Sequence, residues 1–435
     1  MRLGHVFLEE ETKVMKMQRA TSRTSRKSNL ISGAWGGLAV AILTLLLAGP
    51  AFAGTAKQVT RGDKTFFEID GELFPALEPL GPPPIPKDNP QRVDAEGWPL
   101  EDDPKVKLGK LLFFEPALSG DGSVSCQTCH VQGAGWALNS AISRSYPGQS
   151  HWRNSQSVVN AAYMSKLFWD GHTASLETQA PSAAKGLAGN GKHDMMSARL
   201  TVIPEYVEMF TEAFGSIRNP MKDSWRAISA YERTLTSTDS PIDQYLRGDK
   251  DALDESQVRG MDLFNGKARC IMCHNGKLAS DEKFYNLGLP RQPLFSEIAK
   301  NQIGFRSQNY GAGLPEEMFR KTKSDLGLYH RTHNHEDAGL FRTQPLRFIE
   351  YTPPYYHNGV MDDLFEVVEF YNDGGGEDYI LEDMGFSTKT DRLRKLNLTS
   401  DEMDDLVAFL EGFSGTEILT SVPELPKPPV RVSIK

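Results

Sequence analysis

The chain has 435 residues and a formal net charge of −9 at pH 7. Because an acidic chain is repelled by the phosphate backbone, nucleic acid is excluded as the expected partner. The length suits two domains of ordinary size.

The first fifty residues have the pattern of a secretory signal peptide. Six Lys and Arg residues lie between Lys13 and Lys27, followed by an apolar run from Leu38 to Leu47 and the cleavage pattern Ala51-Phe52-Ala53. The run is short for a membrane span, and an uncleaved N-terminal anchor is the alternative. Because the run starts late, Met15 or Met17 is an alternative first residue. We expect residues 1–53 to be a cleaved signal peptide and the mature protein to be periplasmic.

The rest of the chain is predicted to be mainly helical. Proline-rich residues 54–103 are expected to form an extended arm that wraps the first domain. The spacing of Val106, Leu108, Leu111 and Leu112 predicts a helix from about Lys105 to Phe114. Further helices are predicted over 227–235, from Ser256 towards Phe264, over 362–371, and after a capping box formed by Thr399 and Glu402. Turn-rich sequence at 237–241 predicts a boundary between domains over 54–245 and 246–435.

Two Cys-x-x-Cys-His runs account for all four cysteines of the chain. They contain Cys126, Cys129 and His130, and then Cys270, Cys273 and His274. Two thiols at this spacing add to the vinyl groups of a c-type haem, and the next residue supplies the proximal imidazole of the iron. A zinc site or a redox dithiol is the alternative. The runs are 144 residues apart, which predicts a duplicated domain with one haem in each copy.

The sequence resembles the bacterial di-haem cytochrome c peroxidase family, which includes the MauG-like enzymes. The resemblance covers roughly Leu108 to Phe413. It is carried by the blocks LGKLLFFEPALSGDGSVSCQTCH, RNSQSVVNAAY, FWDGHTASLETQA, RTLTSTDSPIDQYLRGD, GMDLFNGKARCIMCHNG and TPPYYHNGVMDDLFEVVEFY. It implies two cytochrome-c-like helical domains, each with a covalent c-type haem. The N-terminal haem would be peroxidatic, the C-terminal haem would pass electrons, and calcium would bind at the interface.

The resemblance also implies roles for single residues. Trp169 matches a tryptophan that relays electrons between the two haems, and Gln179 matches a glutamine that lines the peroxide pocket. Asp194 is the best match for the acid–base carboxylate that moves a proton between the peroxide oxygens. His151 lies where some relatives place a removable distal ligand, and an open iron with His151 nearby is the alternative. Asn154 matches a calcium-binding residue. Each also has a purely structural alternative, such as a core tryptophan, a solvated loop acid or a turn asparagine.

The sixth ligand of the second haem departs from the family pattern. Relatives that act as simple peroxidases carry a methionine just before the residue that matches Phe341, whereas this chain has Leu340. His335 and His333 are the candidate replacements, and a solvated polar loop is the alternative. An imidazole in place of a thioether would lower the reduction potential of that haem. His357 is expected to be structural.

Three functions follow from the resemblance. The first is an exported peroxidase that reduces hydrogen peroxide, with electrons entering from a small cytochrome c or cupredoxin through the C-terminal haem. The second is a MauG-like maturation oxidase that uses peroxide and a high-valent di-haem state to oxidise residues on a partner protein. The third is a non-catalytic di-haem electron carrier. We predict the first, with two haem c groups and one calcium ion, and a homodimer is compatible with it.

Removal of residues 1–53 leaves a formal charge of −13, since that segment holds seven Lys and Arg against three Asp and Glu. This charge favours a basic protein partner.

Overall fold

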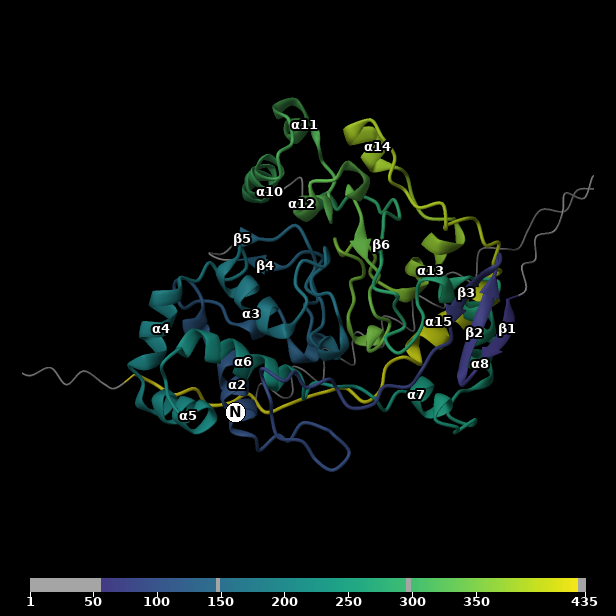
Figure 1. The fold of residues 1–435 in the computed structure, drawn as a ribbon. Coiled ribbons are helices and arrows are strands. Elements are labelled where there is room, and N and C mark those ends of the chain that lie inside the picture. The colour runs from purple at the N-terminus through teal and green to yellow at the C-terminus, as the bar shows by residue number, and fades with distance from the viewer. Residues whose placement is uncertain (1–55, 146–148, 295–298, 429–435) are drawn as a thin grey trace, which may run out of the picture. The chain divides into compact units, whose positions relative to one another are not determined.

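The structure is a computed structural model that describes residues 56–145, 149–294 and 299–428 (Figure 1). The predicted signal peptide lies outside these ranges. Helices dominate, so the prediction of a mainly α chain is confirmed. Within the described ranges, no helix is both long enough and apolar enough to cross a membrane.

The helices and strands follow in chain order. The helices are α2 (Pro104–Phe114), α3 (Leu176–Lys185), α4 (His193–Thr201), α5 (Pro204–Phe214), α6 (Pro220–Glu232), α7 (Pro241–Leu246), α8 (Glu255–Asn265), α10 (Ala299–Gly311), α11 (Glu316–Lys321), α12 (Tyr329–Thr332), α13 (Leu364–Asn372), α14 (Tyr379–Met384) and α15 (Ser400–Glu411). Strands β1 (Lys57–Arg61), β2 (Lys64–Ile69) and β3 (Glu72–Pro75) form an antiparallel sheet. Two short antiparallel pairs join β4 (Arg144–Ser145) to β5 (Gln149–Ser150) and β6 (Phe284–Tyr285) to β7 (Phe341–Arg342).

In the first half of the chain, which contains the first Cys-x-x-Cys-His run, α2 packs against α6 (Figure 1). Asp103 caps α2 by accepting a hydrogen bond from the backbone N–H of Lys105, and Pro104 occupies the first turn. A Cβ atom at Gly109 would lie 1.9 Å from the backbone oxygen of Ala227, so only glycine allows the two helices to approach this closely. The contact closes a hydrophobic core that includes Phe113.

The second half repeats this arrangement with α8 and α15 (Figure 1). A Cβ atom at Gly260 would lie 2.1 Å from the backbone oxygen of Asp405. Phe264 follows Gly260 by four residues, just as Phe113 follows Gly109, and it is fully buried in a second core. The predicted capping box at Thr399 is confirmed at the start of α15. The two helix pairs therefore share one arrangement, with a glycine at each crossing.

The N-terminal arm differs from its prediction. Ile69, Phe74 and Leu77 are buried in the second core together with Phe264 and Phe409. The prediction that residues 54–103 wrap the first domain is therefore wrong for residues 57–77, whose sheet contributes apolar side chains to the other core. Further along, Asn89 does contact the first half, where its Nδ2 donates to Glu177 on α3 and to the carbonyl of Arg226 on α6.

Candidate active site

The first Cys-x-x-Cys-His run lies just after α2, on the 3-10 turn η3 (Cys126–Thr128). Ser125 and Thr128 form a reciprocal capping box that fixes this turn. The Nδ1 of His130 donates to the carbonyl of Trp136 at 3.2 Å, and burial lowers the pKa of His130. A neutral imidazole that donates from Nδ1 presents the lone pair of Nε2 to a metal. This is the geometry required of a proximal haem ligand.

The second run repeats this geometry on η6 (Cys270–Met272). His274 Nδ1 donates to the carbonyl of Ala279 at 3.0 Å, and burial lowers the pKa of His274. Cys270, Cys273 and His274 together line a cavity of about 310 Å³. The cavity gives the thiols and the imidazole a common space in which a macrocycle can be attached.

The thiols themselves favour haem over the alternatives. Burial raises the pKa of Cys270 to about 12 and that of Cys273 to about 11. A redox dithiol needs a thiolate at neutral pH, which such an environment disfavours. In the part of the chain that the structure describes, no group of three or more His, Cys, Asp or Glu side chains is arranged to hold a metal ion. The residues present therefore fit a covalent haem at each run.

Trp169 is held by contacts from both halves of the chain. Its ring is buried, and its Nε1 donates to the carbonyl of Asn154 at 2.9 Å. Its own carbonyl accepts from the backbone N–H of Arg342 at 2.9 Å. The residue lines the cavity of the second run, with its ring centroid 6.3 Å from that of His357. An oxidisable indole is thus fixed at the edge of the second haem cavity by a segment close to the first run.

Two glutamine side chains, one from each half of the chain, are hydrogen-bonded to each other. The Gln156 backbone interacts with the His130 ring, and the Gln344 backbone interacts with the His274 ring. The Gln156 side chain donates from Nε2 to Oε1 of Gln344. This hydrogen bond joins a segment of the first half of the chain to a segment of the second half.

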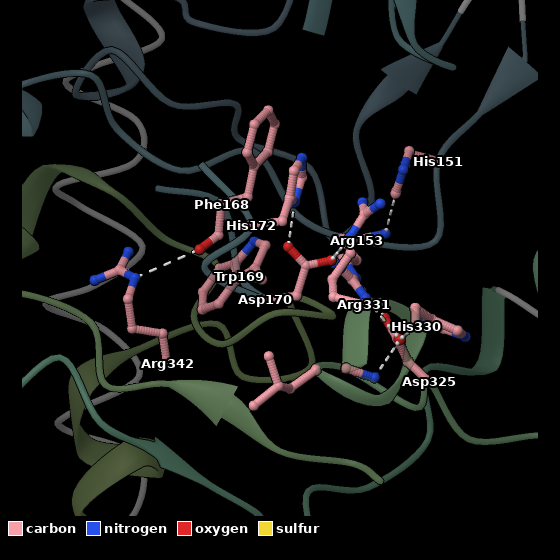
Figure 2. A network of polar contacts seen from close by, with 12 residues as sticks. His151, Arg153, Phe168, Trp169, Asp170, His172, Asp325, His330, Arg331 and Arg342 are labelled. Carbon is pink, nitrogen blue, oxygen red and sulfur yellow. Dashed lines mark hydrogen bonds and ion pairs between the residues drawn. The ribbon is translucent and has the colours of Figure 1, made fainter. Parts of the chain in front are cut away.

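A buried network of charges surrounds the stretch after Trp169, as Figure 2 shows. Arg153 Nη1 donates to Asp170 at 2.9 Å, while Nε and Nη2 donate to Asp325 at 2.6 and 2.9 Å. His172 donates from Nδ1 to Asp170 at 2.5 Å, and Arg331 donates to the same carboxylate at 3.2 Å. The network links the first half, through Asp170, to the second half, through Asp325.

The network is ionised in spite of its burial. Burial alone would raise the pKa of Asp170 and of Asp325, but the Arg153 charge outweighs it and holds both pKa values well below their usual range. The same two carboxylates raise the pKa of Arg153 against the effect of burial. Two carboxylates and two guanidinium groups then balance in charge beside Trp169.

The predicted peroxide-pocket residues differ in exposure. Gln179 is half-buried on α3, whereas Asp194 is exposed on the first turn of α4, next to the exposed His193. Among the described residues, the side chain of Asp194 forms no hydrogen bond or ion pair. His151 is half-buried and accepts a hydrogen bond from the backbone N–H of Arg153 at its Nδ1. Burial lowers the pKa of His151 to about 4, so this ring is neutral.

The histidines considered for the second haem differ in exposure. His333 and His335 are exposed, and His335 stacks on Phe386 with ring centroids 5.3 Å apart. His357 instead lines the cavity, stacked on Phe341 at 3.6 Å. Sequence reasoning missed His172, Gln156, Gln344 and Arg342, although a charged residue between Phe341 and Thr343 was a signal for the last.

Asn154 is buried, and its Nδ2 donates to the carbonyl of Ser140 at 2.8 Å. Carboxylates are the usual core of a calcium site, and no metal-holding cluster of them occurs among the described residues. A calcium ion here would need the Asn154 amide oxygen together with backbone carbonyls.

Two helical halves with matching Cys-x-x-Cys-His sites define a di-haem c-type cytochrome. A family model described as di-haem cytochrome c peroxidase matches residues 103–251. Cytochrome-c peroxidase IdrP1 of Pseudomonas sp. (strain SCT) is 46% identical over 388 residues, which cover 88% of this chain and 95% of that protein. IdrP1 of Denitromonas iodatirespirans is 47% identical, with 89% of this chain and 96% of that protein covered. The chain belongs to the di-haem cytochrome c peroxidase family, as its sequence blocks predicted.

Solved structures agree with this assignment. The crystal structure of a MauG-like protein associated with microbial copper homeostasis is similar, with a TM-score of 0.61 and 28% sequence identity. The similarity covers 77% of this chain and 93% of that chain.

Proposed function

We propose that this protein is an exported, periplasmic oxidoreductase that reduces hydrogen peroxide with electrons from a small cytochrome c or cupredoxin. Electrons would enter at the haem of Cys270 and Cys273 and pass through Trp169 to the haem of Cys126 and Cys129. The observation that carries this proposal is the attachment of Trp169 to both halves, through Asn154 and Arg342. The similarity to proteins named cytochrome-c peroxidase supports it.

The bound haem would supply an iron that exchanges electrons one at a time. His130 and His274 would hold the two irons from the proximal side, with their Nδ1 atoms fixed by backbone carbonyls. The Arg153 network would keep the backbone around Trp169 rigid, because each carboxylate is bonded to a guanidinium group. Such fixed geometry lowers the reorganisation needed for electron transfer.

Proton transfer in the peroxide pocket is proposed for Asp194, with Gln179 holding the distal oxygen. His151 is proposed as the distal residue of the first haem, and His335 or His333 as the sixth ligand of the second. A calcium ion at Asn154 and a homodimer are further proposals.

The test is steady-state turnover of hydrogen peroxide with a reduced small cytochrome c as donor. The expected result is oxidation of about two donor molecules per peroxide, because the reduction of peroxide to water takes two electrons. The matched control is a variant with Cys126 and Cys129 changed to Ser, which should retain the second haem and lose turnover. Full turnover without the first haem would contradict the proposal.

The second candidate function is maturation of a partner protein by oxidation of its side chains. Leu340, at the position of the family's methionine ligand, favours it, as does the likeness to a MauG-like protein. The two functions differ in the source of electrons. If peroxide is consumed only when a protein substrate is present, and small cytochromes are not oxidised, the maturation role holds and the peroxidase proposal fails.

A further inference from the structure

One of the buried arginines of this protein has no carboxylate partner. Four arginine residues are buried among the described residues, namely Arg153, Arg233, Arg342 and Arg347. Three of them form ion pairs with carboxylates at 2.5 to 2.9 Å. Arg342 is the most buried of the four, with 2% of its surface exposed. In the part of the chain that the structure describes, it forms no ion pair.

The partners of Arg342 are all uncharged. Its guanidinium donates to the carbonyl of Phe168 at 3.4 Å, the carbonyl of Thr343 at 3.1 Å and Oε1 of Gln344 at 3.1 Å. These bonds use three of the five N–H donors of an arginine. Burial lowers the pKa of Arg342 to about 10, so the group is still charged at neutral pH. The charge of Glu282 offsets only part of this effect. A buried cation with no carboxylate in contact is costly unless an anion accompanies it.

The position of Arg342 indicates which anion that is. The residue lines the same cavity as Cys270, Cys273 and His274. The side chain of His357 lines it too, and its Nδ1 is buried without a hydrogen-bond partner among the described residues. A haem attached at this run would bring two propionate carboxylates, the only anionic substituents of the macrocycle, into the cavity.

We propose that Arg342 binds a propionate carboxylate of the haem attached to Cys270 and Cys273, and is the positioning residue that fixes this haem's edge against Trp169. The proposal rests on the haem attachment assigned above and deepens the proposed electron path. Arg342 is suited to this role because its backbone N–H already holds the carbonyl of Trp169 at 2.9 Å. One residue would then contact both the relay tryptophan and the haem.

The charge of Arg342 should also set the potential of that haem. A cation close to a haem stabilises the reduced iron, which carries one positive charge fewer than the oxidised iron. Charged residues and hydrogen bonds around a haem are among the means by which a protein tunes its potential. Loss of the cation should therefore shift the equilibrium towards the oxidised state.

The test compares Arg342→Met and Arg342→Lys in the intact di-haem protein, and none of its measurements needs peroxide turnover. A pyridine haemochrome assay counts the haems, the propionate bending mode in the resonance Raman spectrum reports the carboxylate contact, and a spectroelectrochemical titration gives the potential of each haem. In Arg342→Met we expect two haems and a shifted propionate mode. The equilibrium constant for reduction of the second haem should fall at least tenfold, which is 59 mV for one electron. Arg342→Lys should restore most of the potential.

Arg392→Met is the matched control, because Arg392 lines the same cavity and its loss makes the same change in net charge. Its guanidinium is paired with Glu72 at 3.1 Å and its side chain is 29% exposed. We expect the equilibrium constant for reduction of the second haem to change less than twofold in Arg392→Met. An equal shift of the potential of the second haem in the two methionine variants would overturn the proposal. An unchanged propionate mode in Arg342→Met would overturn it as well. If Arg342→Met does not retain haem, the propionate contact is tested in Arg342→Lys instead. A point charge cannot reproduce the planar fork of arginine, so an unchanged propionate mode in that variant would also overturn it.

Discussion

Arg153 and Asp325, separated by 172 residues in the sequence, are joined by two hydrogen bonds of 2.6 and 2.9 Å. The same guanidinium also binds Asp170, which directly follows Trp169. One side chain therefore connects the segment of the predicted distal histidine, the relay tryptophan and a loop of the second half. A buried contact of this kind is expected to control how firmly the two halves are held around Trp169.

Asp325→Ala should destabilise the protein by about 3–5 kcal/mol, because it leaves part of the Arg153 charge buried and uncompensated. The free energy of unfolding from chemical denaturation measures the effect. Glu316→Ala is the control, since Glu316 pairs with Arg320 on the exposed surface of α11. An exposed pair of this kind contributes about 0–1 kcal/mol. Equal losses in the two variants would show that the buried network is no more important than a surface pair.

Replacement of Cys270 and Cys273 by Ala should leave one haem bound and abolish turnover with a cytochrome donor. The second haem is the proposed point of electron entry, so its loss interrupts the path even though the first haem remains. The pyridine haemochrome assay should find two haems in the wild type and one in the variant. Met272→Leu, between the two cysteines, is the control and should keep both haems. Retained turnover in the double variant would rule out the relay.

Trp169→Phe should slow electron transfer between the haems at least tenfold while both haems stay attached. Phenylalanine keeps an aromatic ring but is harder to oxidise, and it cannot donate to the carbonyl of Asn154. Flash reduction followed by optical detection of each haem measures the rate. Trp225→Phe removes an indole of similar burial from the core of the first half and serves as the control. A rate in Trp169→Phe that matches this control would exclude Trp169 as the relay.

Features that depend on neighbouring residues could be predicted from the sequence. The Cys-x-x-Cys-His spacing located both haem sites, and Thr399 with Glu402 located the start of α15, because capping depends on neighbours three residues apart. The glycine crossings were not predicted, although Gly109 and Gly260 stand at equivalent places. Their meaning depends on which helix lies opposite, and that is a tertiary property.

Contacts between distant segments could not be predicted. Gln156 and Gln344 are separated by 188 residues, and no local pattern marks two glutamines as partners. The exposure of Asp194 agrees with the alternative of a solvated acid, which the sequence left open beside the acid–base role. The proline-rich arm was predicted to wrap the first domain, yet Ile69 and Phe74 supply apolar surface to the second core. Burial of this kind depends on the whole fold.

Glu232 should make the stability of the protein depend on pH. It is buried on α6, and its Oε2 has no hydrogen-bond partner in the described part of the chain. Burial raises the pKa of Glu232 to about 8; the Arg233 charge opposes this and Glu177 adds to it. The ordinary value is 4.5, so between these pH values the folded protein holds a proton that the unfolded chain releases. The stabilisation is complete below pH 4.5 and is lost as the pH rises through about 8.

The measurement is the free energy of unfolding at pH 5 and pH 8.5 in the wild type and in Glu232→Gln. Each unit of pKa difference corresponds to about 1.4 kcal/mol, so the wild type should lose on the order of 4 kcal/mol more than the variant over this range. Because all other titrating groups are shared, the difference isolates Glu232. Parallel pH profiles for the two proteins would mean that Glu232 is ionised in the folded state.

The last prediction concerns the second haem and the choice between the two enzyme functions. A thioether ligand stabilises ferrous iron, whereas an imidazole favours ferric iron, and Leu340 stands where relatives carry the methionine. We expect the oxidised second haem to lack the far-red sulfur-to-iron charge-transfer band. We also expect peroxide to react with the fully oxidised enzyme, with no prior half-reduction.

Met164 and Met272 are the methionines of the cavity wall, and Met272 lies between the attachment cysteines. Met164→Leu is therefore the control, because a band that is present in the wild type and absent in this variant would identify Met164 as the ligand. If the oxidised enzyme is inert to peroxide and reacts only after one electron has been added, the maturation function is excluded. A reductively activated peroxidase is then the remaining enzyme function, whichever residue binds the second iron.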